Sequence, residues 1–367
     1  MKLEHGIASE ATISRMLSGI DQELFALVLA KWATELINKY CGLHIIIDGK
    51  ALRGATEKIK DGRVPYILNA IDAATQLVIG QIAIADKKNE ISTIPVLLDT
   101  LGMRDNTYTI DAIGTNQEII IKILDNGGHV VLQVKKNNPV LYDEIISAFE
   151  TFRKEKMLSD SEQNRSLSPF LKVYDDVKKQ EKNRERIEYR EMEVCQNSAF
   201  LNSTNSVYKE LIPRLGTIGC ATQVRVPIEK DKDGNDITVS KEEFLRNGSR
   251  RKPKPQKGDG IKDDYQCVGM IADEFLSAEE MSKIKRDHWK IENGAHHVLD
   301  VDLREDMSTA TKSSVNLSVI RKFAYNIIRL AILKEFGTKS PIRMMDCFCD
   351  DPEILMPYIF AEIESLN

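Results

Sequence analysis

The stretch that decides the fold is His44-Ile-Ile-Ile-Asp-Gly49, a short run of β-branched residues that ends in Asp-Gly. Such a run is typical of a buried strand that leads into a turn. Two further runs, 64–72 and 76–85, have the composition of an antiparallel pair of strands with a tight turn at 73–75. After them we expect a helix over 92–101 and a strand over 107–111.

The alternation continues to residue 134. Thr115-Asn-Gln-Glu118 has the capping-box pattern and predicts a helix that ends at Gly127-Gly128, with a strand over 129–134 after it. The order over 44–134 is three strands, helix, strand, helix, strand. This order predicts an α/β fold with a mixed sheet covered by helices on both faces, in the order of a ribonuclease-H-like core.

Changes of pattern along the chain divide it into five segments. Helical spacing of apolar residues predicts an N-terminal helical segment over 1–41, the first part of the core over 42–139, and a core helix over 276–310. Further helices are expected over 311–367. Between them, 140–275 is read as an insertion that is β-rich, from the short apolar stretches 187–194, 219–226 and 265–271, and that carries a basic loop.

The composition excludes several classes of protein. The chain has 367 residues, of which 42% are hydrophobic and 29% charged, which is typical of a globular protein. It has no apolar run long enough to cross a bilayer and no signal-peptide pattern, so we expect a cytoplasmic location without a membrane partner. Six scattered cysteines favour reduced thiols. A net charge of −5 counts against nucleic-acid binding over the whole surface but allows a local basic patch.

Three carboxylates are the candidates for chemistry. Asp48 and Asp111 each end an apolar strand, and the two strands are neighbours in a sheet of the proposed order, whereas Glu292 lies on a later helix. Clustered carboxylates are the ligands that Mg²⁺ prefers, and two such ions support in-line displacement at phosphorus. Spacing alone leaves other interpretations open: an Asp before Gly is commonly a turn residue, and a Glu on an amphipathic helix commonly faces solvent.

The sequence motifs around these residues resemble those of a known family. Ile46-Ile-Asp-Gly-Lys-Ala-Leu-Arg-Gly54, Asn89-Glu-Ile-Ser-Thr-Ile-Pro95 and Tyr108-Thr-Ile-Asp-Ala-Ile-Gly114 occur in that order, followed by His288-Trp-Lys-Ile-Glu-Asn293 and Leu299-Asp-Val-Asp-Leu-Arg-Glu-Asp306. Together they resemble the H-repeat-associated branch of bacterial insertion-sequence DDE transposases. The resemblance runs from about His5 to Leu330.

The resemblance implies a function. It places the metal-binding catalytic triad at Asp48, Asp111 and Glu292, with Mg²⁺ as the cofactor and Mn²⁺ as a substitute. The implied activity is cleavage at the ends of an insertion sequence, followed by joining of the freed 3′-hydroxyls to target DNA. Double-stranded DNA is then the partner, the protein acts as a homodimer on it, and it is associated with the nucleoid when bound.

Several cations and histidines are candidates for DNA contact. Lys50 and Arg53 follow Asp48, Lys135 and Lys136 follow a core strand, and a basic loop contains Arg250, Arg251 and Lys252. Such residues neutralise phosphates, although a solvated surface explains them equally well. His288 and His296 share a helix face with Glu292, which suits either a scissile phosphate or, less well, a zinc ion.

Two departures from the related transposases affect the expected activity. Relatives carry a longer N-terminal helical region, and they have Leu-His-Trp where this chain has Ala295-His296-His297. Two alternatives therefore stay open beside the transposase. One is a decayed or domesticated remnant that binds DNA without cutting it, and the other is a stand-alone metal-dependent nuclease.

Overall fold

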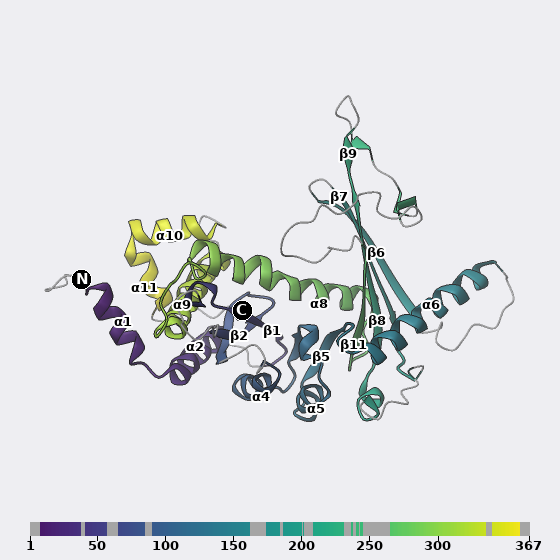
Figure 1. Cartoon of the computed structure of the whole chain (residues 1–367), viewed down its shortest axis with the longest axis horizontal. Helices are drawn as coiled ribbons and strands as arrows, with labels where there is room; N and C mark the ends of the chain where they lie inside the picture. The colour runs from purple at the N-terminus through teal and green to yellow at the C-terminus, as the bar shows by residue number, and fades with distance from the viewer. Residues whose placement is uncertain are drawn as a thin grey trace. The chain divides into compact units, whose positions relative to one another are not determined.

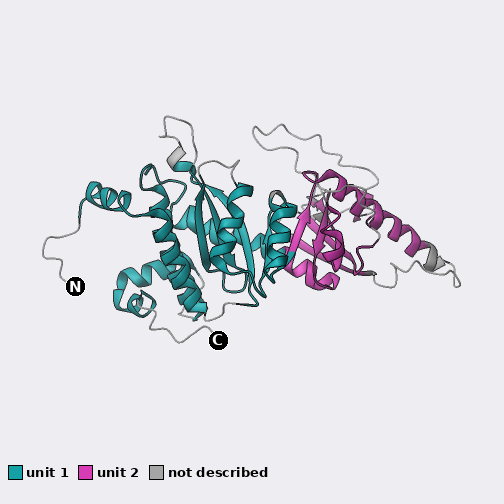
Figure 2. Ribbon diagram, turned by 90° about the horizontal axis from the view of Figure 1, so that it is seen from below, with its two compact units in different colours: residues 1–130, 286–367 teal, residues 131–285 magenta. Residues whose placement is uncertain are grey.

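The structure is a computed structural model of the chain (Figure 1). It describes residues 8–37, 41–56, 65–84, 90–161, 174–183, 186–199, 201, 208–230, 236–237, 240–241, 243–244, 265–334 and 340–359. The chain forms two compact units, shown in separate colours in Figure 2. Unit 1 comprises residues 1–130 and 286–367, and unit 2 comprises residues 131–285.

Two helices form the described part of the N-terminal helical segment that the sequence predicts. Helix α1 spans Glu10–Ser18 and α2 spans Gln22–Ile37. The side chain of Ser9 accepts a hydrogen bond from the Thr12 amide and caps α1. Asp21 accepts one from the Leu24 amide at 2.8 Å, at the start of α2. Polar caps therefore separate two apolar stretches that would otherwise read as one helix.

The sheet of unit 1 has the strand order β3-β2-β1-β4-β5. Its strands are β1 (His44–Ala51), β2 (Tyr66–Asp72), β3 (Val78–Ile84), β4 (Thr107–Ile110) and the start of β5 (His129–Val134). β1, β2 and β3 pair antiparallel, whereas β4 runs parallel to β1 and β5 runs parallel to β4. The predicted α/β fold with a ribonuclease-H-like mixed sheet is confirmed.

Helices cover both faces of this sheet. On one face, Leu97 and Leu101 of α4 (Glu90–Leu101) lie against Gly80 of β3, and α5 (Gln117–Asp125) packs beside α4. On the other face, α2 and α9 (Ser314–Leu333) share a buried core with β1, β2 and β3. Asn326 of α9 bonds the backbone of Val78 in both directions at 2.9 Å, which fixes α9 on β3.

The long helix that carries Glu292 differs from the prediction. A regular core helix was expected within 276–310, but α8 (Ala278–Ile291) is followed by two π-helical segments, Glu292–His296 and Val298–Asp302. Wider π turns occur often at functional sites, and they shift the side chains that follow around the helix axis. The last elements among the described residues are α10 (Pro341–Asp350), a 3₁₀ turn (Pro352–Leu355) and α11 (Met356–Ile359).

Unit 2 is an antiparallel sheet with helices on both faces. Its strand order is β5-β11-β8-β7-β6, formed by the end of β5, β11 (Tyr265–Ala272), β8 (Thr217–Pro227), β7 (Arg186–Cys195) and β6 (Tyr174–Asn183). Three of these strands coincide with the apolar stretches predicted at 187–194, 219–226 and 265–271. The remaining strand, β6, was not predicted, because Tyr174–Asn183 is mostly charged.

Helix α6 (Pro139–Ser161) and the start of α8 lie on opposite faces of the unit 2 sheet. Arg153 of α6 bonds Glu193 of β7, whereas Met281 of α8 packs with Met192 on the other face. A short pair, β9 (Glu229–Lys230) and β10 (Asp236–Ile237), stands apart from this sheet in the hydrogen-bond pattern. None of the described helices is long and apolar enough to span a membrane.

Candidate active site

Asp48 lies in the middle of β1, on the face of the unit 1 sheet that packs against α2 and α9. Its neighbour two residues earlier, Ile46, is completely buried in that core. The side chain of Asp48 is 22% exposed and lies 3.5 Å from Nδ1 of His296. Burial is the main cause that raises the pKa of Asp48, to about 7. The carboxyl group is therefore partly protonated at neutral pH.

The two other predicted carboxylates flank Asp48. Asp111 directly follows β4, where its exposed side chain accepts a hydrogen bond from the Ala112 amide at 2.7 Å. Glu292 is the exposed first residue of the π-helical segment after α8. The negative charges of Asp111 and Glu292 both contribute, after burial, to the raised pKa of Asp48. The structure thus brings the three carboxylates into one electrostatic neighbourhood.

The donor set suits Mg²⁺ or Mn²⁺, which prefer carboxylate oxygens. Carboxylates that repel one another form a region of negative potential that a divalent cation offsets. However, among the residues that the structure describes, no three His, Cys, Asp or Glu side chains are close enough together to hold a metal ion. The residues fit the ion by chemistry and charge, and they would have to close around it.

A fourth carboxylate was missed by the sequence analysis. Glu90, the first residue of α4, is 4% exposed, and its charge also raises the pKa of Asp48. It shares a hydrogen bond with the hydroxyl of Tyr66, whose ring lies over Gly49 so closely that a Cβ there would approach Cζ to 2.8 Å. Glu90 lies in the quoted segment 89–95, so the resemblance had marked the segment but not the residue.

Lys50 was predicted to contact DNA, but the structure places it in a buried ion network. Its ammonium bonds Asp300 and, at 2.5 Å, Oε2 of Glu305, and only 8% of the residue is exposed. Ser318 of α9 donates to Glu305 at 2.6 Å, and Lys322 donates to Ser318 at 2.6 Å. An ammonium bound to two carboxylates is not available to a phosphate. Lys50 instead ties the strand of Asp48 to the segment that follows Glu292.

His296 adjoins Asp48 without forming an ion pair. Burial, together with the positive charges of Lys50 and Lys322, lowers the pKa of His296 to about 4. The imidazole is therefore neutral at pH 7. Its Nε2 atom is buried and has no hydrogen-bond partner among the described residues. Asp48 therefore has an uncharged imidazole 3.5 Å from its carboxylate.

His288 is also turned inward. It is 8% exposed, and its Nδ1 lies 3.1 Å from the hydroxyl of Thr109 on β4. The same hydroxyl lies 3.0 Å from Nε2 of His44 on β1. The three side chains connect α8 to the strands that lead to Asp48 and Asp111. A DNA contact by His288 would require this packing to change.

A row of buried amides crosses the sheet beside Asp48. Asn69 on β2 is the register partner of Asp48, and Gln81 on β3 is the partner of Asn69. They are 1% and 5% exposed, and the polar side-chain atoms of both lack hydrogen bonds among the described residues. A buried amide without a hydrogen bond costs about 1–3 kcal/mol, so these two side chains are candidates for contact with water or an ion beside Asp48.

The remaining candidates for DNA contact differ in how exposed they are and in the unit to which they belong. Arg53, the first residue of the short helix α3 (Arg53–Thr56), is exposed in unit 1. In unit 2, Lys135 is partly exposed and Lys136 is exposed, immediately after β5. Arg250, Arg251 and Lys252 lie outside the described residues.

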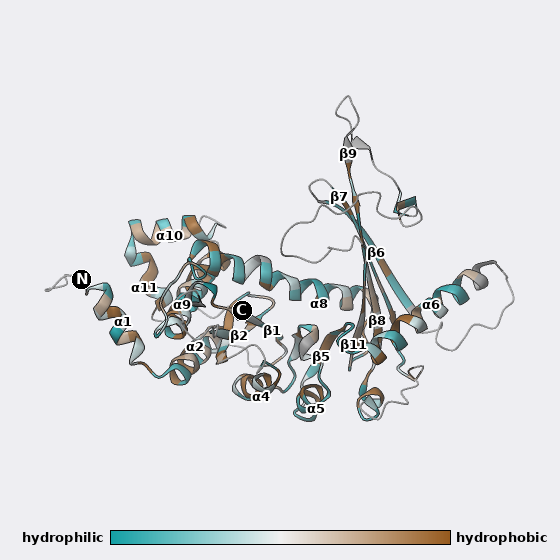
Figure 3. Ribbon diagram, in the orientation of Figure 1, coloured by the Kyte–Doolittle hydropathy of each residue, from teal (hydrophilic) through white to brown (hydrophobic). Residues whose placement is uncertain are grey.

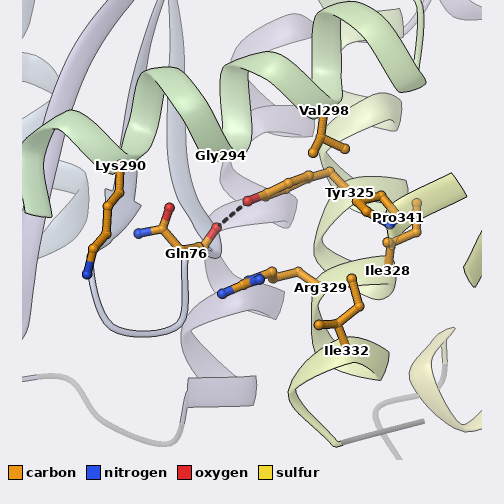
Figure 4. A pocket seen from close by; sticks show the side chains of 9 residues that line it. All are labelled: Gln76, Lys290, Gly294, Val298, Tyr325, Ile328, Arg329, Ile332 and Pro341. Carbon is orange, nitrogen blue, oxygen red and sulfur yellow. Dashed lines mark hydrogen bonds between the residues drawn. The ribbon is translucent and has the colours of Figure 1, made fainter. Parts of the chain in front are cut away.

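A pocket of about 310 Å³ lies behind the π-helical segment in unit 1 (Figure 4). The hydroxyl of Tyr325 donates to the carbonyl of Gln76 at 2.9 Å, and Arg329 donates to the carbonyl of Thr75 at 2.9 Å. These bonds attach the turn between β2 and β3 to α9. The triad does not line the pocket, whose walls are Gln76, Lys290, Gly294, Val298, Tyr325, Ile328, Arg329, Ile332 and Pro341.

The chain is similar to several transposases. It is 27% identical over 328 residues to "Putative transposase YncI" of Escherichia coli O157:H7, which covers 89% of this chain and 72% of that protein. It is 27% identical over 342 residues to "H repeat-associated putative transposase YhhI" of Escherichia coli K12, which covers 93% of this chain and 78% of that protein.

A solved structure of the piggyBac transposase synaptic complex with hairpin DNA aligns with 92% of this chain and 58% of its own, at 11% identity and a TM-score of 0.37. The transposase DDE domain family matches residues 39–327. This match spans Asp48, Asp111 and Glu292 together with unit 2. The chain therefore belongs to the transposase DDE domain family.

Proposed function

We propose that the protein cleaves DNA at the ends of an insertion sequence and joins the freed 3′-hydroxyls to target DNA, with Asp48, Asp111 and Glu292 as its catalytic and metal-binding residues. The observation that carries the proposal is the electrostatic coupling of Asp48 to Asp111 and Glu292. Membership of the family favours a catalytic role for these carboxylates over the two alternatives, a turn residue and a residue on a solvated helix face.

Asp48, Asp111 and Glu292 would hold Mg²⁺, or Mn²⁺ in its place. The ions supply a hydroxyl nucleophile at neutral pH and stabilisation of the leaving oxygen. The neutral His296 lies 3.5 Å from Asp48, and Lys50 holds β1 in place through Asp300 and Glu305. In this role Lys50 and His296 position the triad.

The partner we propose is double-stranded DNA, held by a homodimer because two element ends must be joined. Of the predicted contacts, Arg53 in unit 1 and Lys135 and Lys136 in unit 2 are accessible, so we assign phosphate contacts to them. For His288 and His296 the buried settings favour support of the triad over a direct contact. The protein would act in the cytoplasm, on nucleoid DNA.

The test is strand cleavage and joining on labelled duplexes that carry the element's own ends, with Mg²⁺ or Mn²⁺. Asp48→Asn, Asp111→Asn and Glu292→Gln should each lower the rate by more than about 100-fold, the upper range for residues that only support a metal ligand. Glu118→Gln, an exposed residue of α5, serves as the control and should cleave like the wild type.

Each outcome decides between the alternatives. Cleavage that survives all three substitutions would contradict the assignment of the catalytic triad. Cleavage without joined products would indicate a nuclease, and DNA binding without cleavage by the wild type would indicate a remnant that has lost turnover.

A further inference from the structure

Helix α8 carries a lysine on the stripe that faces the unit 2 sheet. Ala278 and Met281 are completely buried in the core of unit 2, and Lys285 follows them on the same helix face. The helix is otherwise mostly hydrophilic (Figure 3), so this narrow apolar stripe decides which face packs on the sheet. Lys285 therefore lies at the end of the stripe, where the core gives way to charged residues.

Three strands place cations on the same face. Arg190 shares its side of β7 with the buried Met192, and Arg225 shares its side of β8 with Ala221. Lys135 follows β5 on the side of Val131, which belongs to the same core. We name Lys135, Arg190, Arg225 and Lys285 the unit 2 basic cluster.

Two carboxylates on this face are engaged by arginines. Glu188 is 2% exposed and contacts Arg186, Arg190 and Arg225, and Glu181 bonds Arg190 at 2.5 Å. One buried carboxylate thus serves three guanidinium groups. Nε of Arg225 is buried without a hydrogen bond among the described residues.

Lys285 has no carboxylate partner within the described part of the chain. Burial, together with the positive charges of Lys135, Arg190 and Arg225, lowers the pKa of Lys285 to about 8. A partly buried cation among other cations is unfavourable, and an arriving anion relieves that repulsion.

We propose that the unit 2 basic cluster is a binding site for the phosphates of a DNA backbone. This proposal rests on the proposed function. A cluster of cations binds polyanions in general, and DNA is the polyanion that the proposed reaction requires. β5 and β7 are three strand spacings apart, about 14 Å, which allows contact with more than one phosphate. Arg190 and Arg225 are 27% and 20% exposed, so the cluster is open to solvent.

The experiment measures binding of the full-length protein to a 30-base-pair duplex of arbitrary sequence, by fluorescence anisotropy in EDTA over a range of KCl concentrations. Lys285→Met removes the charge and keeps the stem that packs on the sheet. It should weaken binding several-fold and lower the slope of log K against log [KCl] by about one. Lys285→Arg should bind nearly as the wild type does.

Lys283→Met is the matched control, because Lys283 is exposed on the same helix, two residues away. It should leave the salt slope unchanged. The melting temperature separates binding from folding: Lys285→Met removes an unpaired, partly buried charge and should melt at or above the wild type. Equal affinity and equal salt slope for Lys285→Met and Lys283→Met would overturn the assignment.

A second arm distinguishes the source of the phosphate. If pyrophosphate raises the melting temperature of the wild type but not of Lys285→Met, while both bind the duplex equally, the site is one for free phosphates and the assignment to DNA is wrong. The outcomes also separate the two proposals. Loss of cleavage with Lys285-dependent DNA binding contradicts only the proposed reaction, whereas normal cleavage with Lys285-independent binding contradicts only the cluster.

Discussion

Replacing Glu305 by glutamine removes the negative charge that Lys50 and Lys322 share and leaves two buried ammonium groups without it. Lys322 and Lys50 lower the pKa of Glu305 from 4.5 to about 2 despite its burial. A difference of about 2.5 pKa units corresponds to about 3 kcal/mol of stabilisation. Removing one partner of a buried ion pair costs about 3–5 kcal/mol, so the two magnitudes agree. Glu305→Gln should therefore lose about 3 kcal/mol of unfolding free energy at pH 7.

Urea unfolding followed by tryptophan fluorescence measures this loss in unit 1, which contains Glu305, because both tryptophans, Trp32 and Trp289, also belong to unit 1. Glu23→Gln, the same change at an exposed position of α2, is the control and should change stability by less than about 0.5 kcal/mol. A carboxylate whose pKa is lowered in the folded state stabilises the protein above pH 4.5, and this stabilisation is lost as the pH falls toward 2. The difference between wild type and Glu305→Gln should shrink over that range. A loss below about 1 kcal/mol at pH 7, or a difference that grows on acidification, would refute the reasoning.

Three further predictions concern the site. Mg²⁺ or Mn²⁺ should raise the melting temperature of the wild type by relieving carboxylate repulsion, and scanning fluorimetry should show a smaller rise for Asp48→Asn; equal rises would contradict the metal site. Gly49→Ala should cost about 1–3 kcal/mol in urea unfolding because its Cβ meets the ring of Tyr66, whereas Gly19→Ala, whose Cβ would lie 3.5 Å from the nearest neighbour, should be tolerated. Asn69→Leu should raise stability yet slow cleavage, since it removes an unpaired amide beside Asp48; a variant that is both less stable and fully active would oppose this.

Local patterns were enough to predict most of unit 1. The run that leads to Asp48 is β-branched and follows Gly42, so it reads as a buried strand whatever its partners. The turn predicted at Asp48-Gly49 was wrong, because β1 continues through Gly49 to Ala51 in register with β2. The placement of Asp48 beside Asp111 follows from strand order, which the sequence also predicts. The cap of α5 was displaced by one residue: Asn116, not Thr115, caps the helix, accepting a bond from Glu118 at 2.8 Å. Two adjacent side chains can make the same cap, and only the backbone conformation selects one.

The roles of Lys50 and His288 could not be predicted from local sequence. A lysine beside a catalytic aspartate looks like a phosphate ligand until Asp300 and Glu305, about 250 residues later, are found against it. His288 likewise meets Thr109 across 179 positions. The spacing of apolar residues predicts which face of a helix or strand is buried. It does not predict which charged residue from a distant part of the sequence is buried against that face.

Two elements were missed for other reasons. Strand β6 lies in a segment of mixed charge, and its long polar side chains obscure the apolar spacing on which such predictions depend. Helix α6 does have helical apolar spacing, at Leu141, Ile145, Phe149 and Phe152, which was overlooked when 140–275 was read as a β-rich insertion. The π-helical segment at Glu292 departs from the 3.6-residue period, so a prediction based on that period extends the α-helix through it. Its position therefore became visible only in the structure.

The central claim is that these carboxylates hold the metal ions of a DNA-cleaving site, and Asp111→Cys tests it most directly. Asp111 is exposed, so the fold should tolerate the change, and a thiolate suits the transition metal Mn²⁺ better than Mg²⁺. Glu118→Cys on the nearby helix is the control and should cleave with either ion. The account predicts that Asp111→Cys cleaves element ends hardly at all with Mg²⁺ and regains part of its activity with Mn²⁺. Wild-type rates with Mg²⁺, or no gain with Mn²⁺, would contradict it.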